Sequence, residues 1–156
     1  MDKSQAILTF LQTCPTIKDN PLFFNFGDIK DNANQTMFQS DDKALDRPYI
    51  DGSVLKRFTF SIDSFKAINY IPVTNGLMDE NLEGFQEVQN ILDWISSQDK
   101  LHNYPEFGNK FFIDKMKTLT SKPDLVGVDT TQTPAMAIYR ISIQIDYIDK
   151  SECLWN

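Results

Sequence analysis

The chain has 156 residues and a formal net charge of −7 at pH 7, with 41% hydrophobic and 24% charged residues. These totals are typical of one soluble globular domain, here spanning residues 1–156. The acidic balance argues against a protein that wraps nucleic acid, because Lys and Arg carry the affinity for phosphate. No segment approaches the roughly 18–20 uninterrupted apolar residues of a membrane helix, and the N-terminus lacks a signal-peptide pattern, so we expect a protein of the cytoplasm.

The N-terminal part is predicted to contain a helix, a short strand and a long loop. Apolar residues recur every three or four positions from Ile7 to Cys14, which predicts a helix over residues 3–14. An aromatic segment over residues 21–26 is predicted to be a strand. Residues 28–46 are polar and rich in turn formers, so we expect a long loop there, with short extended pieces at most.

Two regular elements are predicted in the middle of the chain. Over residues 54–67, Phe58, Phe60 and Ile62 alternate with polar residues, which is the two-residue period of a strand with one buried face. A helix is predicted from about residue 79 to residue 98, because its apolar residues follow a helical spacing and acidic residues lie near its N-terminus.

The C-terminal third is predicted to be mostly strand. Residues 110–119 and 125–128 are expected to form two strands, and residues 135–149 a third one of unusual length. In this last segment β-branched and aromatic residues occupy the odd positions from Ala137 to Tyr147, while the even positions from residue 140 on are polar. We expect it to be the central strand and to pair with the strand at residues 54–67, buried on the same face.

The predicted order is α-β-β-α-β-β-β. Because two helices can bury their apolar stripes only against the sheet, we expect an α+β fold with one mostly antiparallel sheet and two helices packed on it. The two cysteines, Cys14 and Cys153, belong to no CxxC pattern, so we expect free thiols in a reducing compartment.

No motif in the sequence indicates catalysis, a bound metal or a cofactor. There is no glycine-rich phosphate loop, no GxSxG, no HExxH and no paired Cys/His cluster. The lone His102 lacks neighbouring ligands. Carboxylates such as Asp114 and Asp124 fall at predicted turns and strand ends, where solvated charges are usual. We therefore expect a binding or structural protein, since an enzyme that used scattered carboxylates would need a cleft that the sequence does not indicate.

Several segments share their order and spacing with a known protein family. They are the N-terminal helix, the aromatic strand Leu22–Phe26, the segment Tyr49-Ile50-Asp51-Gly52-Ser53, the helix carrying Asp93-Trp94-Ile95, and the closing strand from Tyr139 to Tyr147. In these segments the chain resembles the minor capsid proteins of tailed bacteriophages that act as tail terminators or tail completion proteins. The resemblance covers most of the chain and rests on no single motif.

The resemblance implies a structural virion protein with a tail-terminator-like fold. Such a protein forms a ring, expected to be a hexamer, on the head-proximal end of the tail tube, where it stops tube polymerisation and joins the tail to the neck. Its implied partners are further copies of itself, the tail tube protein, the neck or head–tail connector proteins and, in a contractile tail, the sheath. DNA would pass through the acidic lumen without specific binding. The implied location is the tail–neck junction of the virion, after assembly in the host cytoplasm.

Large apolar side chains outside the predicted core are the candidates for ring and tube contacts. Subunits in a ring meet through two different surfaces, and buried aromatic anchors commonly carry the energy of such contacts. Burial within the monomer is the alternative for every one of these side chains. The candidates are Met37, Phe38, Phe107, Phe111, Phe112 and Trp155.

A second function fits the same totals. A small acidic immunity or inhibitor protein that masks a basic partner would also combine a net charge of −7 with the lack of catalytic motifs. This alternative predicts a monomer or a one-to-one complex, whereas a tail terminator predicts a ring.

Overall fold

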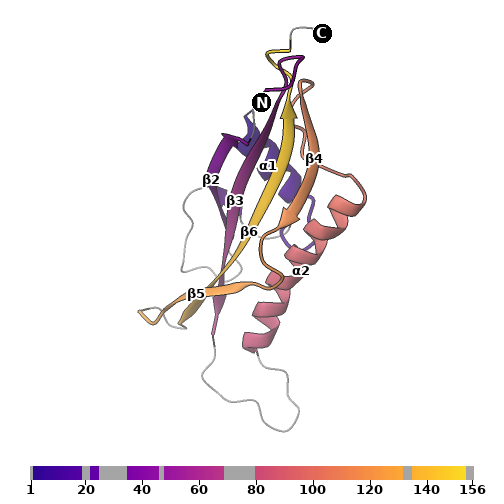
Figure 1. Cartoon of the computed structure of the whole chain (residues 1–156). Coiled ribbons are helices and arrows are strands. Elements are labelled where there is room, and N and C mark those ends of the chain that lie inside the picture. Colours follow the sequence, from indigo (N-terminus) through magenta and orange to yellow (C-terminus); the bar gives the residue numbers. More distant parts are fainter. Residues whose placement is uncertain are drawn as a thin grey trace.

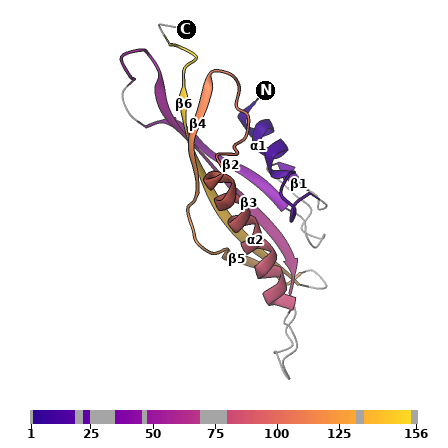
Figure 2. The same cartoon turned by 90° about the vertical axis from the view of Figure 1, so that its right-hand side faces the viewer.

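The computed structural model describes residues 2–18, 22–24, 35–45, 48–68, 80–131 and 135–153, in which two helices pack on one sheet of six strands. The helices are α1 (Lys3–Leu11) and α2 (Glu80–Lys100). The strands are β1 (Leu22–Phe24), β2 (Gln35–Ala44), β3 (Val54–Ala67), β4 (Phe111–Thr118), β5 (Asp124–Asp129) and β6 (Met136–Asp149). Both helices lie on the same side of the sheet (Figures 1 and 2). The predicted α+β class is confirmed.

The sheet is built around β6. Its strand order is β1-β2-β3-β6-β4, and β5 also pairs with β6. All pairings are antiparallel except that of β1 with β2, which is parallel. One edge of β6 is paired with β3 along its whole length. The other edge of β6 is shared by two strands, with β4 at its C-terminal half and β5 at its N-terminal half. The prediction of a central last strand beside the strand at residues 54–67 is therefore confirmed.

The register of β3 and β6 decides which side chains the helices cover. Phe60 pairs with Ile143, and both are at most 2% exposed beneath the helices. The next pair, Ser61 with Ser142, faces the opposite side, because successive residues of a strand point to opposite faces. We call this second side the open face, since no helix of the described residues lies over it (Figure 1).

The two helices pack against the sheet and against each other. Phe10 of α1 and Trp94 of α2 bring their ring centroids to 5.0 Å. Gly84 of α2 is buried against β3, where an added Cβ atom would lie 3.2 Å from Cβ of Lys66. A glycine that is a poor helix former in isolation thus allows a close approach of α2 to the sheet. The Lys66 ammonium group then pairs with Glu87, one turn further along α2.

The prediction of a loop over residues 28–46 is wrong for residues 35–44, which form β2 and pair along β3. A bulge between Gln39 and Asp41 interrupts the two-residue alternation, and two polar residues at the start of the strand are fully buried. Because of these two features, the pattern of apolar and polar residues in the sequence does not predict a strand here. Residues 28–34 lie outside the described residues. The observed order is therefore α-β-β-β-α-β-β-β, and the other elements agree with prediction to within three residues at their ends.

Ile143→Ala should strongly destabilise the fold, because Ile143 is fully buried and its truncation leaves a cavity. We expect a loss of about 2–5 kcal/mol in the free energy of unfolding, measured with urea. Ser142→Ala, one residue earlier and on the open face, is the control and should cost less than about 1 kcal/mol. Equal losses for the two variants would contradict the register.

Ser64→Ala should leave stability unchanged or raise it by up to about 1 kcal/mol. The Ser64 hydroxyl is buried opposite Gln35, and neither side chain makes a hydrogen bond within the described residues. The control is Ser4→Ala, because the buried Ser4 hydroxyl does donate to Oε1 of Gln39, at 2.8 Å. That variant should lose about 1 kcal/mol. A clear loss of stability in Ser64→Ala, measured by urea unfolding, would show that its hydroxyl has a partner.

Candidate interaction surfaces

The open face carries charged side chains held in cross-strand pairs. Arg57 of β3 donates from Nε and Nη2 to the two carboxylate oxygens of Asp146 on β6, at 2.8 and 3.2 Å. Arg140 of β6 makes the same two-bond contact with Asp63 of β3, at 2.8 and 3.0 Å. On β4, Nζ of Lys115 lies 3.6 Å from Oδ2 of Asp146. These charge-assisted bonds tie the three central strands together.

Asp146 is the most enclosed of these charges, with only 3% of its surface exposed. Burial alone would raise the pKa of its carboxyl group, but the hydrogen bond and charge of Arg57, helped by Lys115, outweigh burial and lower the pKa. The side-chain amide of Gln144, turned so that its oxygen faces the guanidinium group, accepts a further bond from Arg57. Asp146 therefore stays ionised at neutral pH and anchors the cations around it.

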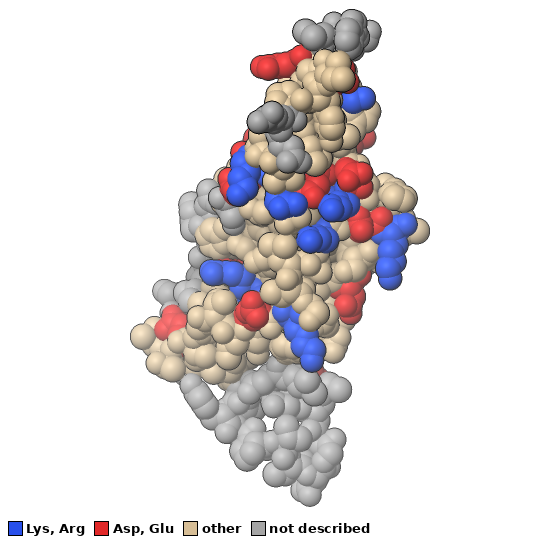
Figure 3. All heavy atoms as spheres, viewed as in Figure 1, with Lys and Arg blue, Asp and Glu red and all other residues tan. Residues whose placement is uncertain are grey.

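Four cations gather around Asp146 on this face. In the sheet register, Lys43 lies opposite Arg57, Lys115 opposite Asp146, and Lys117 opposite Gln144, so their side chains share one side. The side chains of Lys43 and Lys115 are 62% and 53% exposed. Figure 3 shows Lys and Arg side chains interspersed with Asp and Glu over the middle of this side of the molecule. We define the basic patch as Lys43, Arg57, Lys115 and Lys117, with the anions Asp41 and Asp146 among them.

A second polar cluster joins α1 to the sheet on the helix side. The Tyr147 hydroxyl donates to Oδ1 of Asp42 at 2.6 Å, and Lys3 of α1 pairs with Oδ2 of the same carboxylate at 3.3 Å. Lys56 and Asp149 form the neighbouring pair, at 2.9 Å. Burial would raise the pKa of Asp149, but hydrogen bonds from Lys56 and Ser151 outweigh it and lower the pKa to about 2.

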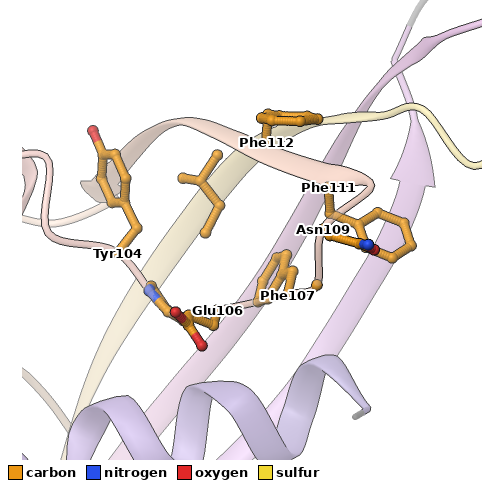
Figure 4. A pocket seen from close by; sticks show the side chains of 9 residues that line it. Tyr104, Glu106, Phe107, Asn109, Phe111 and Phe112 are labelled. Atoms are coloured by element: carbon orange, nitrogen blue, oxygen red, sulfur yellow. The ribbon is translucent and has the colours of Figure 1, made fainter. Parts of the chain in front are cut away.

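The connection from α2 to β4 forms a pocket of about 470 Å³ with the first residues of β4. Figure 4 shows Tyr104 and Phe111 toward opposite ends of this pocket, with Phe107 between them. The Tyr104 hydroxyl donates to Oδ1 of Asp99 at 2.8 Å. Burial, and then the contact with Asp99, raises the pKa of Tyr104 to about 12, so this phenol is a poor base at neutral pH. No nucleophile and base are in contact among its nine lining residues, four of which are aromatic.

The turn between β2 and β3 presents apolar side chains to solvent. Ile50 is 92% exposed and Tyr49 52%. Oδ1 of Asp51 accepts hydrogen bonds from the backbone N–H and the hydroxyl of Ser53, at 2.9 and 2.6 Å, which fixes the turn. Gly52 has a φ of +88°, and a Cβ atom there would lie 2.7 Å from the carbonyl oxygen of Glu152. Only glycine therefore fits where the turn meets the C-terminal segment.

A further apolar surface follows the edge of the sheet at β5. This strand pairs only with β6 among the described strands, and its other edge is not paired. Four apolar side chains near this edge are between 45% and 58% exposed. An unpaired edge with apolar side chains is a common place for contact with another chain. The residues are Leu119, Leu125, Val126 and Val128.

Two predicted contact residues are corrected by their burial. Met37 is fully buried in β2, on the core side, and not in a loop. Phe107 is 3% exposed, and its ring centroid lies 5.3 Å from that of Tyr147 and 6.0 Å from that of Phe58. Both side chains therefore belong to the hydrophobic core, as in the alternative of burial within the monomer.

The other candidates have different positions. Phe38 is partly exposed on the open face, opposite Ser61. Phe111 is partly buried, with Nζ of Lys3 4.9 Å from its ring centroid. Phe112 is 50% exposed on the open face, and Nζ of Lys150 lies 4.8 Å from its ring centroid. Trp155 lies outside the described residues.

Sequence reasoning did not single out Ile50 or the β5 side chains as contacts. The apolar Ile50 inside a turn sequence was the available signal for the first. For β5, apolar residues at consecutive positions 125 and 126 indicated a strand that cannot bury both its sides.

Neither a protein-family model nor a curated protein matches the sequence. Within the described residues, no helix is long and apolar enough to cross a membrane, and no three His, Cys, Asp or Glu side chains gather where they could hold a metal ion. The evidence for a function of this protein therefore comes from the interaction surfaces described above.

Asp149 should account for part of the acid sensitivity of the fold. Its pKa is about 2 in the folded protein and about 4 in an unfolded chain. The folded state thus favours the charged form, so the stability from this group is complete above about pH 4 and is lost as the pH falls through about 2.

Asp149→Asn should lower the free energy of unfolding at pH 7 by about 1–2 kcal/mol and should reduce the loss between pH 4 and pH 2. Urea unfolding of both proteins across this range measures the difference. A difference that does not change with pH would contradict the lowered pKa.

Proposed function

We propose that this protein is a tail terminator, a structural subunit that forms a ring on the head-proximal end of a phage tail tube and joins the tail to the neck. The observation that carries the proposal is the open face, where long paired strands expose a patterned surface that no described helix covers. A ring requires each subunit to offer two different surfaces to its neighbours. The open face and the opposite, helix-covered side of the subunit differ in this way.

The size of the open face suits a stable contact. β3 and β6 each have 14 residues, so at about 3.3 Å per residue the face is about 45 Å long. Four strands at about 4.8 Å spacing make it about 20 Å wide. The resulting outline of about 900 Å² is of the same order as the roughly 800 Å² that one partner contributes to a standard interface. The accessible part is smaller than the outline, because Ser61, Asp63, Gln144 and Asp146 within it are at most 8% exposed.

The remaining surfaces suit the other partners of a terminator. The turn that carries Ile50 lies at one end of the molecule, next to the C-terminal segment (Figure 1). Its exposed apolar side chains offer an anchor for the tube or neck proteins, and the apolar edge at β5 offers another. The net charge of −7 suits a lumen through which DNA slides with little adhesion.

Assembly and tube capping test the proposal. We expect the purified protein to form rings of six in light scattering and negative-stain images, or to form them on the ends of tubes made from the tube protein of the same genome. Capped tubes should stop growing. A monomer that leaves tube growth unchanged would contradict the proposal and favour the acidic inhibitor.

Phe38→Ala and Phe112→Ala should weaken assembly without unfolding the protein, because both rings are partly exposed on the open face. We expect at least a tenfold weaker association in sedimentation experiments, as is typical when an aromatic anchor is removed. Met37→Ala is the contrasting variant, since it should instead lower stability by about 2–5 kcal/mol. Unchanged assembly in both phenylalanine variants would remove the open face from the contact.

A further inference from the structure

We propose that the basic patch of one subunit binds the acidic outer side of α2 on a second copy of this chain. This inference rests on the proposed function, because it identifies a contact between neighbouring subunits of the ring. It commits to two specific surfaces on opposite sides of the sheet. The contact therefore cannot form within one subunit.

The charge distribution of the chain identifies the kind of partner. The basic patch contains four of the 15 cations and two of the 22 anions, an excess of two positive charges. The rest of the chain therefore carries an excess of nine negative charges. A positive surface on so acidic a protein attracts an acidic partner, and other copies of the same chain are such partners.

The outer side of α2 supplies the complementary surface. Glu83 and Asp93 are exposed on the side of the helix away from the buried stripe of Val88, Ile91, Leu92 and Ile95, and Glu87 is exposed at the edge of this side, toward Lys66 of the sheet. Lys100, the last residue, is the only cation of this helix. Glu87 is also paired with Lys66, and Asp93 accepts a hydrogen bond from Gln89. Of the three, Glu83 and Asp93 make no ion pair within the described residues, so their charges remain to meet cations of another subunit.

The dimensions of the two surfaces agree. α2 has 21 residues, which at about 1.5 Å per residue gives a length of about 32 Å. This fits along an open face of about 45 Å. Short side chains, Thr59, Ser61 and Ser142, lie in the middle of that face, with Phe38 and the longer cations beside them. A helix lying along this surface would rest on the short side chains and contact Phe38 and the cations at its sides.

The arrangement produces a head-to-tail contact. α2 lies on one side of the sheet (Figure 2), and the strand register places the side chains of the basic patch on the other. Each subunit therefore uses its helix side toward one neighbour and its open face toward the next. Heterologous contacts of this type close into a ring when the rotation between subunits permits it.

Reversing the charges on each surface separately tests the contact. The first variant, Lys43→Glu with Lys117→Glu, makes the patch acidic and leaves the Arg57–Asp146 pair in place. The second, Glu83→Lys with Asp93→Lys, replaces both unpaired anions on the outer side of α2 by cations and leaves the Lys66–Glu87 pair in place. Circular dichroism and urea unfolding check that both variants fold.

Each variant alone should associate at least tenfold more weakly than the wild type, measured by sedimentation, because it meets itself with like charges. An equal mixture should recover assembly, since the acidic patch of the first variant faces the lysines introduced on α2 of the second and the reverse pairing also holds. The recovered ring would alternate the two variants. Raising the salt concentration to about 0.5 M should weaken wild-type assembly.

The control variant is Lys18→Glu with Lys110→Glu, which changes the net charge as much as the first variant but at exposed residues away from the patch. It should assemble like the wild type. If the wild type assembles only on tube ends, the wild type, the two reversed variants, their mixture and the control are compared by their capping of tubes.

Normal assembly by both reversed variants, or no recovery in the mixture, would overturn this contact while leaving the tail-terminator proposal intact. A wild type that neither self-associates nor caps tubes would instead reject both proposals. If Lys43→Glu with Lys117→Glu abolished binding to a DNA duplex but left assembly unchanged, the patch would be a nucleic-acid site and the contact would be rejected.

Discussion

The pairing of β3 with β6 is the constraint on which the rest of the structure depends. The two strands pair without interruption from Val54 opposite Asp149 to Ala67 opposite Met136. A shift of one residue would exchange the buried rows with the polar rows. Because both helices, β2, β4 and β5 are placed relative to this pair, its register determines the core and the open face together.

Two kinds of interaction select this register. The apolar alternation fixes which face of each strand is buried, but a shift of two residues would preserve it. The directly opposed pairs, Arg57 with Asp146 and Asp63 with Arg140, would both be broken by such a shift. A break would leave enclosed carboxylates without their partners, which is costly. The hydrophobic pattern thus excludes a shift of one residue between β3 and β6, and the ion pairs exclude a shift of two residues.

The apolar rows and the ion-paired rows of β3 and β6 give the subunit two chemically different sides. Apolar side chains meet the helices, and the ion pairs leave an exposed cationic surface in an otherwise acidic protein. Asp146, held ionised inside this surface, binds Arg57 and Lys115, while Lys43 pairs with Asp41. A surface of this kind favours an electrostatically selected partner over a purely apolar one.

The sequence by itself determined the class of fold, the pairing of the two long strands and their buried rows, because these follow from local periodicity. It did not reveal β2, since Gln35 and Thr36 are buried only when β3 lies beside them and the bulge after Gln39 breaks the alternation. Nor did it distinguish the exposed Phe112 from the buried Phe107, which are five residues apart and equally apolar. Only the tertiary structure decided these points, together with the gathering of Lys43, Arg57, Lys115 and Lys117, because strand pairing brings together residues that are distant in the sequence.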